Sequence, residues 1–125
     1  MRLKSELWVQ AYLRRCALND VPAVVLQRGQ SDGGAIFVSV LRLDGTGELF
    51  GPAPAGLDAA AHDRVFELRT PAARVPEAEL NRLIARERDF DPDLWVVEIE
   101  SREGTHHLDD WLARDRDDGE SSTGW

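Results

Sequence analysis

DFDPDLWVVEIE, residues 89–100, joins a helix-breaking turn to a strand of alternating apolar side chains. Pro92 ends the preceding helix, because proline cannot donate the next backbone hydrogen bond and disfavours helical geometry at the residue before it. Alternation predicts that one face of the strand carries Trp95, Val97 and Ile99. The other face carries Leu94 and Val96. Apolar side chains on both faces predict an inner strand of a sheet, with Trp95 in the core.

Two helices and four further strands are expected around this strand. Apolar residues at helical spacing predict helices over residues 5–18 and 76–88. Ser5 is suited to cap the first helix, and Pro76 opens the second. Runs rich in β-branched and aromatic residues predict strands at residues 23–28, 35–42, 47–51 and 65–69.

The order of these elements predicts a mixed sheet. The polar SDGG segment at residues 31–34 predicts a hairpin between the strands at 23–28 and 35–42. The strand, helix and strand over residues 65–100 predict a right-handed parallel crossover. We therefore expect an α/β fold, bordering on α+β, with a single mixed five-stranded sheet and helices packed on both faces.

The chain has the size of one domain, with 125 residues and a mass of 14.0 kDa. Residues 1–100 are expected to form this α/β domain. Residues 101–125 are expected to form an acidic C-terminal extension that is partly helical or disordered. That extension holds three basic and seven acidic side chains, so it carries half of the net charge of −8.

Charge and hydropathy argue against two classes of partner. A net charge of −8 disfavours nucleic acid, because binding to phosphates needs clustered cations. No apolar run approaches the about 20 residues that cross a bilayer, so no membrane partner is expected. The amino terminus is charged from Arg2 and does not resemble a signal peptide, which predicts a cytoplasmic location. The single Cys16, in the apolar stripe of the first helix, is expected to be a buried thiol.

Four acidic residues form the first candidate site: Asp91, Asp93, Glu98 and Glu100. Divalent metals and general acid–base catalysis both use carboxylates. The pattern is similar to the Pro-Asp and Glu-x-Lys of nucleases, but position 100 is Glu and both halves lie on one strand. The plainer interpretation is that Asp91 and Asp93 are turn residues and that the two glutamates end a solvated strand.

Other familiar kinds of site are not assembled in the sequence. His106-His107 lies close to Asp109-Asp110, but adjacent residues do not converge on one metal ion. The glycines are turn glycines, because no phosphate-binding pattern occurs. No serine or cysteine has an evident histidine partner for nucleophilic catalysis. We therefore expect no catalytic residue, no metal and no cofactor.

Trp111 is the remaining candidate binding residue. With Leu108 and Leu112 it would form the apolar face of a short helix among acidic residues, which suits docking onto another protein surface. Packing on the chain's own domain, or disorder, is the plainer interpretation. Trp8 and Tyr12, one turn apart on the first helix, fit either a self-association patch or the core.

Four segments resemble one bacterial family: MRLKSELWV at 1–9, GPAP at 51–54, FELR at 66–69 and RDFDPDLWVVEIE at 88–100. The family is known only as domain of unknown function 1491, and the resemblance covers residues 1 to about 100. It implies a single α/β domain with no known activity. It therefore adds no functional residues.

The sequence favours a small cytoplasmic, non-catalytic binding or protein-interaction module, with a protein partner or self-association as a homodimer. Two alternatives stay open. One is an enzyme of unknown type that uses the acidic edge around Asp91, Asp93, Glu98 and Glu100. The other is an acidic tail that binds a basic protein surface and loses affinity in salt.

Overall fold

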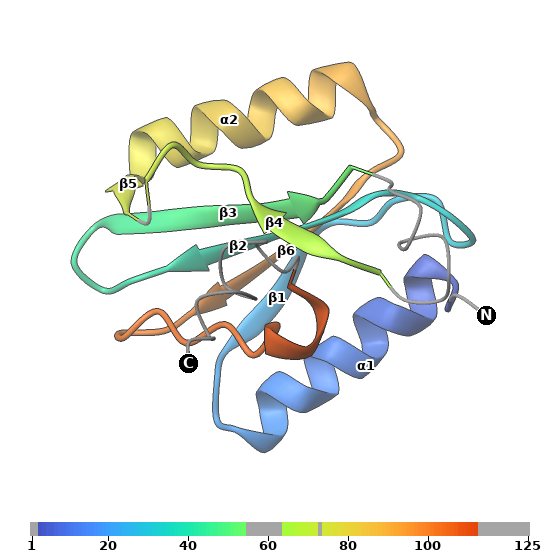
Figure 1. Cartoon of the computed structure of the whole chain (residues 1–125), viewed down its shortest axis with the longest axis horizontal. Coiled ribbons are helices and arrows are strands. Elements are labelled where there is room, and N and C mark those ends of the chain that lie inside the picture. The colour runs from blue at the N-terminus through green and yellow to red at the C-terminus, as the bar shows by residue number, and fades with distance from the viewer. Residues whose placement is uncertain (1–2, 55–63, 73, 113–125) are drawn as a thin grey trace, which may run out of the picture.

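The computed structural model describes residues 3–54, 64–72 and 74–112, which form six strands and two α-helices (Figure 1). The helices are α1 (Ser5–Leu18) and α2 (Glu77–Phe90), and a short 3₁₀ helix covers Asp109–Trp111. The strands are β1 (Ala23–Gln27), β2 (Ile36–Leu41), β3 (Thr46–Pro52), β4 (Phe66–Leu68), β5 (Val75–Pro76) and β6 (Trp95–Glu100).

The strands form one open sheet in the order β1-β6-β2-β3-β4, with β5 paired to β3. β6 is antiparallel to β1 and parallel to β2, and the remaining pairs are antiparallel. α1 and α2 pack on opposite faces of this sheet (Figure 1). The predicted mixed sheet with helices on both faces is confirmed, as an α+β arrangement. The two-residue β5 was not predicted, because so short a strand leaves no periodic pattern.

The predicted hairpin between β1 and β2 is wrong, because β6 lies between these strands. Residues 28–35 form a loop that packs against the chain just before β6. There the Gln30 N–H donates to Asp93 O at 2.9 Å. A Cβ at Gly34 would lie 2.5 Å from Asp93 O, so this close approach needs glycine. Gly34 thus serves a tertiary contact and not a two-strand turn.

The same loop also holds the start of α1. The N–H groups of Ser5 and Glu6 donate to Asp32 O and Ser31 O, at 3.3 and 3.0 Å. Ser5 was expected to cap the helix with its side chain, but its Oγ donates to Gly34 O at 2.6 Å instead. Backbone carbonyls of the loop therefore satisfy helix donors that a side-chain cap would otherwise satisfy.

The predicted crossover joins β4 to β6, which run parallel in the same sheet, but these two strands do not pair with each other. β4 lies at the far edge of the sheet, and β6 pairs in parallel with β2, from Ile36↔Trp95 to Leu41↔Glu100. β2 and β6 both carry buried apolar side chains on both faces. Burial of both faces is greatest in the middle of a sheet, which accounts for their central, adjacent positions.

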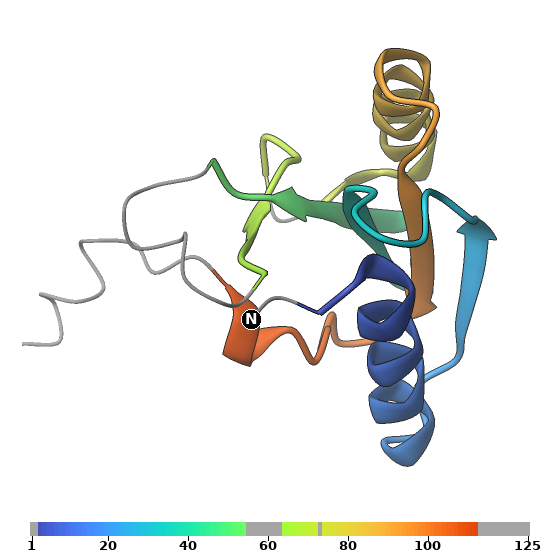
Figure 2. The ribbon, with the colours of Figure 1, turned by 90° about the vertical axis from the view of Figure 1, so that its right-hand side faces the viewer.

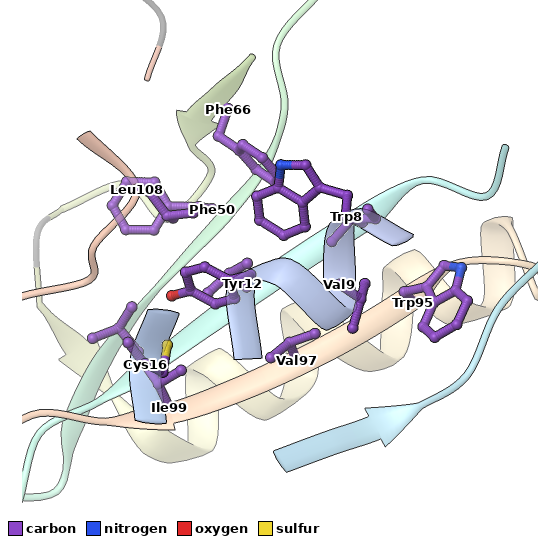
Figure 3. Close-up of a cluster of buried hydrophobic side chains, with 13 residues drawn as sticks. Trp8, Val9, Tyr12, Cys16, Phe50, Phe66, Trp95, Val97, Ile99 and Leu108 are labelled. Atoms are coloured by element: carbon purple, nitrogen blue, oxygen red, sulfur yellow. The ribbon is translucent and has the colours of Figure 1, made fainter. Parts of the chain in front are cut away.

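One core cluster joins α1 to the sheet (Figure 3). α1 contributes Trp8, Val9, Tyr12 and Cys16, so the buried thiol is confirmed. β6 contributes Trp95, Val97 and Ile99, as its alternation predicted. Trp95 is only 1% exposed, and its Nε1–H donates to Gln30 O at 2.9 Å. Burial of a side chain of this size contributes roughly 1.5–3 kcal/mol to stability.

The second core cluster lies under α2. Leu80 and Ile84 of the helix pack on side chains of β2, β3 and β6 and on Leu94, which directly precedes β6. No residue of β1 belongs to this cluster, so the helix does not cover that strand. None of the helices in the described part of the chain is both long and apolar enough to span a bilayer.

Residues 101–112 pack against the α1 face of the molecule. Leu108 is fully buried in the α1 core cluster. The Tyr12 hydroxyl donates to His106 O at 2.6 Å, and the Trp111 ring lies 5.1 Å from that of Trp8. We call residues 106–112 the C-terminal clasp. The rest of the expected extension, residues 113–125, lies outside the described residues.

Candidate functional site

The free edge of the sheet at β1 is the candidate site (Figure 2). Among the described strands, β1 has only β6 as a neighbour. The Glu100 N–H donates to Pro22 O at 3.1 Å, which fixes the phase of this antiparallel ladder. Because such ladders alternate, the N–H and C=O groups of Ala23 and Val25 point away from β6. β1 therefore offers unpaired backbone donors and acceptors to a partner.

Two apolar side chains of β1 are exposed beside these groups. Val24 and Leu26 are 52% and 51% exposed. Val24 lies directly opposite Glu98, which follows Leu94 and Val96 on the α2 face of the sheet. The edge thus combines unpaired backbone groups with an apolar strip on a face that α2 leaves uncovered.

A shallow pocket lies where β1 begins and β6 ends. Its lining residues are Pro22, Ala23, Val24, Glu98 and Glu100, and its volume is about 180 Å³. Pockets for whole small-molecule ligands measure roughly 300–1,000 Å³, so this one has room for a single side chain or a head group. Apolar walls with carboxylates at one end suit a cation on an aliphatic stem.

Glu98 is the electrostatic centre of this pocket. Burial raises the pKa of Glu98 above its ordinary value, and the carboxylates of Glu77 and Glu100 raise this pKa further. Glu77 comes from the first turn of α2, far from β6 in the sequence. Within the described residues, no ion pair includes any of these three acids. We call Glu77, Glu98 and Glu100 the acidic triad.

Glu48 on β3 shows how the chain treats a buried acid elsewhere. Burial raises the pKa of Glu48 as well, but Arg42 and Arg74 oppose that rise. Two arginines therefore compensate Glu48, whereas every influence on the pKa of Glu98 raises it. Strained electrostatics of this kind are concentrated at functional sites in proteins.

The structure separates the four acids of the sequence-based candidate site. Glu98 and Glu100 lie together at the end of β6 and line the pocket. Asp91 and Asp93 lie before the start of β6, in the turn after α2. There the Asp93 N–H donates to Asp91 Oδ1 at 3.0 Å, which is the plain role of a turn aspartate. An enzyme site that needs all four carboxylates is not assembled.

Trp111 lies on the opposite side of the sheet from the pocket, in the clasp. Its ring packs on Trp8, and the Arg15 guanidinium lies 4.2 Å from its centroid. Trp8 and Tyr12, which fitted either a patch or the core, are core residues with 2% and 0% exposure. The structure therefore shows intramolecular packing for all three aromatic residues.

Two residues of the candidate site were missed from the sequence: Val24, which lines the pocket, and Glu77, which acts on Glu98. Glu77 reads as an ordinary acid at the start of a helix, which the helix dipole favours. Val24 reads as one of a run of strand residues. The sequence carried a weak signal in residues 23–26, AVVL, whose apolar side chains would point to both faces of a strand. Apolar side chains on a face that no helix covers indicate a docking edge. Within the described ranges, no three histidine, cysteine or acidic side chains are arranged to hold a metal ion.

A single open mixed sheet with one helix on each face defines the molecule as an α+β protein. A family model described as "Protein of unknown function (DUF1491)" matches residues 3–109. The chain belongs to this family, as its sequence segments suggested. The match extends nine residues beyond β6 and into the clasp.

Solved structures agree with this assignment. A DUF1491 family protein of Caulobacter crescentus CB15, solved by crystallography, is 32% identical with a TM-score of 0.74, covering 91% of this chain and 100% of that one. An NMR structure of a DUF1491 family protein from the same organism is 33% identical with a TM-score of 0.76, covering 91% and 99%. The solution structure of Atu0922 from A. tumefaciens is 44% identical with a TM-score of 0.68, covering 81% and 87%. The comparison with curated proteins found no match.

Proposed function

We propose that this protein is a non-catalytic, cytoplasmic protein-interaction module that binds a cationic partner protein at the β1 edge. The observation that carries the proposal is the acidic triad beside the exposed Val24 and Leu26. The apolar strip supplies contact area, and the triad supplies a negative field that no ion pair among the described residues compensates. Electrostatic complementarity of this kind sets partner choice and association rate.

The negative charge at this edge disfavours self-association through β1. Pairing of two β1 edges would place an acidic triad on each side of the interface and supply a cation to neither, and like charges across an interface are unfavourable. A second copy of the chain is therefore a poorer fit to this edge than a basic partner. The predicted homodimer would need a different surface, and the acidic tail remains a separate prediction because residues 113–125 lie outside the described residues.

Titration with a short oligolysine peptide tests the proposal. The expected result is a change in the NMR chemical shifts of the Ala23, Val24 and Glu100 amides. The affinity should also fall with added salt, because salt shortens the Debye length from about 10 Å at 0.1 M to about 3 Å at 1 M. The double variant Glu98→Gln with Glu100→Gln should lose most of the affinity. Its loss of charge is matched by the control Asp32→Asn with Asp89→Asn, in which both replaced acids are exposed and neither lines the pocket.

The control should retain the wild-type affinity. Equal losses in the two double variants would show that only net charge matters, and the β1 edge would not be the binding surface. Shift changes confined to residues outside β1 and β6 would have the same meaning.

A further inference from the structure

We infer that the partner binds as an added strand along β1 and places one lysine or arginine side chain in the pocket between β1 and β6. This inference rests on the proposed function and specifies its mode of binding. It concerns the conformation and the chemistry of the bound segment. Strand addition to a free sheet edge is a common way in which proteins recognise extended peptides.

The backbone of β1 is already arranged for an added strand. Ala23 and Val25 turn both their N–H and their C=O groups outward, so an incoming strand finds donors and acceptors at alternate residues. The register shifts between Val25 and Gln27, where Leu26 forms a bulge. Regular pairing therefore covers the part of β1 that begins at the pocket and ends after Val25.

Side-chain geometry places a basic residue in the pocket. An added strand would lie two strand spacings from β6, which is about 10 Å. A lysine on the α2 face of that strand could extend across the short Val24 side chain, which lies directly opposite Glu98. Its methylenes would cover Val24, and its ammonium group would meet Glu98 and Glu100 in a pocket of about 180 Å³.

The acidic triad specifies the charge of that side chain. Burial disfavours the charged form of Glu98 and raises its pKa in the free protein, and repulsion from Glu77 and Glu100 raises this pKa further. A neutral side chain would leave this repulsion in place, and an acidic one would add to it. A cationic side chain is the one that relieves it, so the edge selects against neutral and acidic strands.

Peptides with methylated backbone nitrogens test the inference. The parent peptide is acetylated and amidated Thr-Lys-Val-Lys-Val-Lys-Thr, which places all lysines on one face of a strand. One analogue is N-methylated at the lysines, and the other at the valines and the last threonine. An added strand directs only one of these two sets toward β1, so one analogue should bind about tenfold more weakly while the other keeps its affinity.

Hydrogen exchange gives a second measure on the wild-type protein. The Ala23 and Val25 amides should exchange more slowly when the parent peptide is bound, because they become hydrogen bonded. A peptide with glutamate in place of lysine should not bind. Nα-acetyl-lysine amide, whose side-chain amine is free, should compete only weakly with the parent peptide, since it fills the pocket without pairing with β1.

Each contrary result has a distinct meaning. Equal affinities of the two methylated analogues, or unchanged exchange at Ala23 and Val25, overturn strand addition but leave the proposed function standing. Competition by Nα-acetyl-lysine amide as strong as that of the parent also overturns it, because the pocket then recognises a free amine. Failure of both the parent peptide and oligolysine to bind overturns the proposed function itself.

Discussion

The two edges of the sheet are built in opposite ways. At the β4 edge, Leu112 forms a parallel bridge with Phe66, and the clasp covers the neighbouring core. At the β1 edge, the backbone is unpaired in the described structure, and Val24 and Leu26 remain about half exposed. One edge is closed by the chain's own C-terminal residues, and the other is left open.

This difference separates stability from recognition. Open strand edges invite association with other chains, and proteins usually cover or shorten them. Here the chain covers the β4 edge with apolar packing and places negative charge at the pocket end of the β1 edge. We interpret the first arrangement as a device for stability and the second as a selective binding surface.

The largest effect is expected from Trp95→Ala, which removes the indole that supports β6 beside the open edge. The variant should lose about 3–5 kcal/mol of unfolding free energy. That is a large part of a typical domain stability of roughly 5–15 kcal/mol. Urea denaturation measures the loss. The matched variant Leu26→Ala, on the exposed face of β1, should change stability by less than about 0.5 kcal/mol. Comparable losses in both would place the exposed face of β1 in the packed core and break the comparison.

A somewhat smaller effect is expected at the covered edge. Leu108 is fully buried in the clasp, so Leu108→Ala should cost about 2–4 kcal/mol. Amide exchange at Phe66 should become faster, because the clasp would open more often. Leu68→Ala, at a β4 position that is 41% exposed, serves as the control and should have little effect. Unchanged stability in Leu108→Ala would mean that the clasp does not close this edge.

Glu98→Gln sharpens the comparison, because it should stabilise the protein at neutral pH. The pKa of Glu98 is raised in the folded state, because the fold favours the neutral carboxyl. The resulting contribution to the free energy of unfolding is fully present below pH 4.5, the ordinary pKa, and is lost as pH rises through the folded-state pKa. Glutamine keeps the neutral form at every pH. The gain should be about 0.5 kcal/mol after solvent screening, measured by denaturation at pH 7, and should vanish below pH 4.5. Destabilisation at pH 7 would argue that Glu98 has a structural partner.

His106 should give an effect of similar size, with the opposite response to acid. Burial lowers the pKa of His106, and its Nδ1 accepts the Leu108 N–H at 2.9 Å, which requires the unprotonated atom. The stability from this bond is complete above the ordinary pKa of 6.5 and is lost as pH falls through the folded-state value. Acidification should therefore loosen the clasp by about 0.5 kcal/mol, while it relieves the acidic triad.

His106→Asn tests this pH response, because asparagine keeps an acceptor for Leu108 without a titrating ring. The variant should lose the pH dependence of amide exchange at Leu108. Persistence of that dependence in the variant would assign it to a different titrating group.

The chain's local patterns predicted the faces of strands but not their neighbours. Side chains alternate with a period of two along β6, so this periodicity alone was enough to place Trp95, Val97 and Ile99 on one face. The glycines of residues 31–34 predicted a hairpin, although Gly34 packs against Asp93 instead. A turn signal reports local backbone freedom, and it does not report which strand comes alongside.

In the candidate site, too, local sequence patterns identified some residues, and only the tertiary structure placed the others. Glu98 and Glu100 were recognised because they alternate on one strand, and Asp91 and Asp93 were grouped with them because they are close in the sequence. The structure keeps the first pair, removes the second and adds Glu77, since α2 brings its first turn toward the end of β6. Distance along an extended strand separates residues that are only a few positions apart.

The amino-acid sequence by itself determined the helices, most of the strands, the mixed sheet and the family, because these depend on local periodicity and on segments that can be read in order. Tertiary structure alone decided that β6 enters between β1 and β2, that β1 becomes an open edge and that three distant acids meet beside it. Strand pairing and charge clustering depend on contacts between segments far apart in the chain, and one-dimensional patterns do not encode those contacts directly.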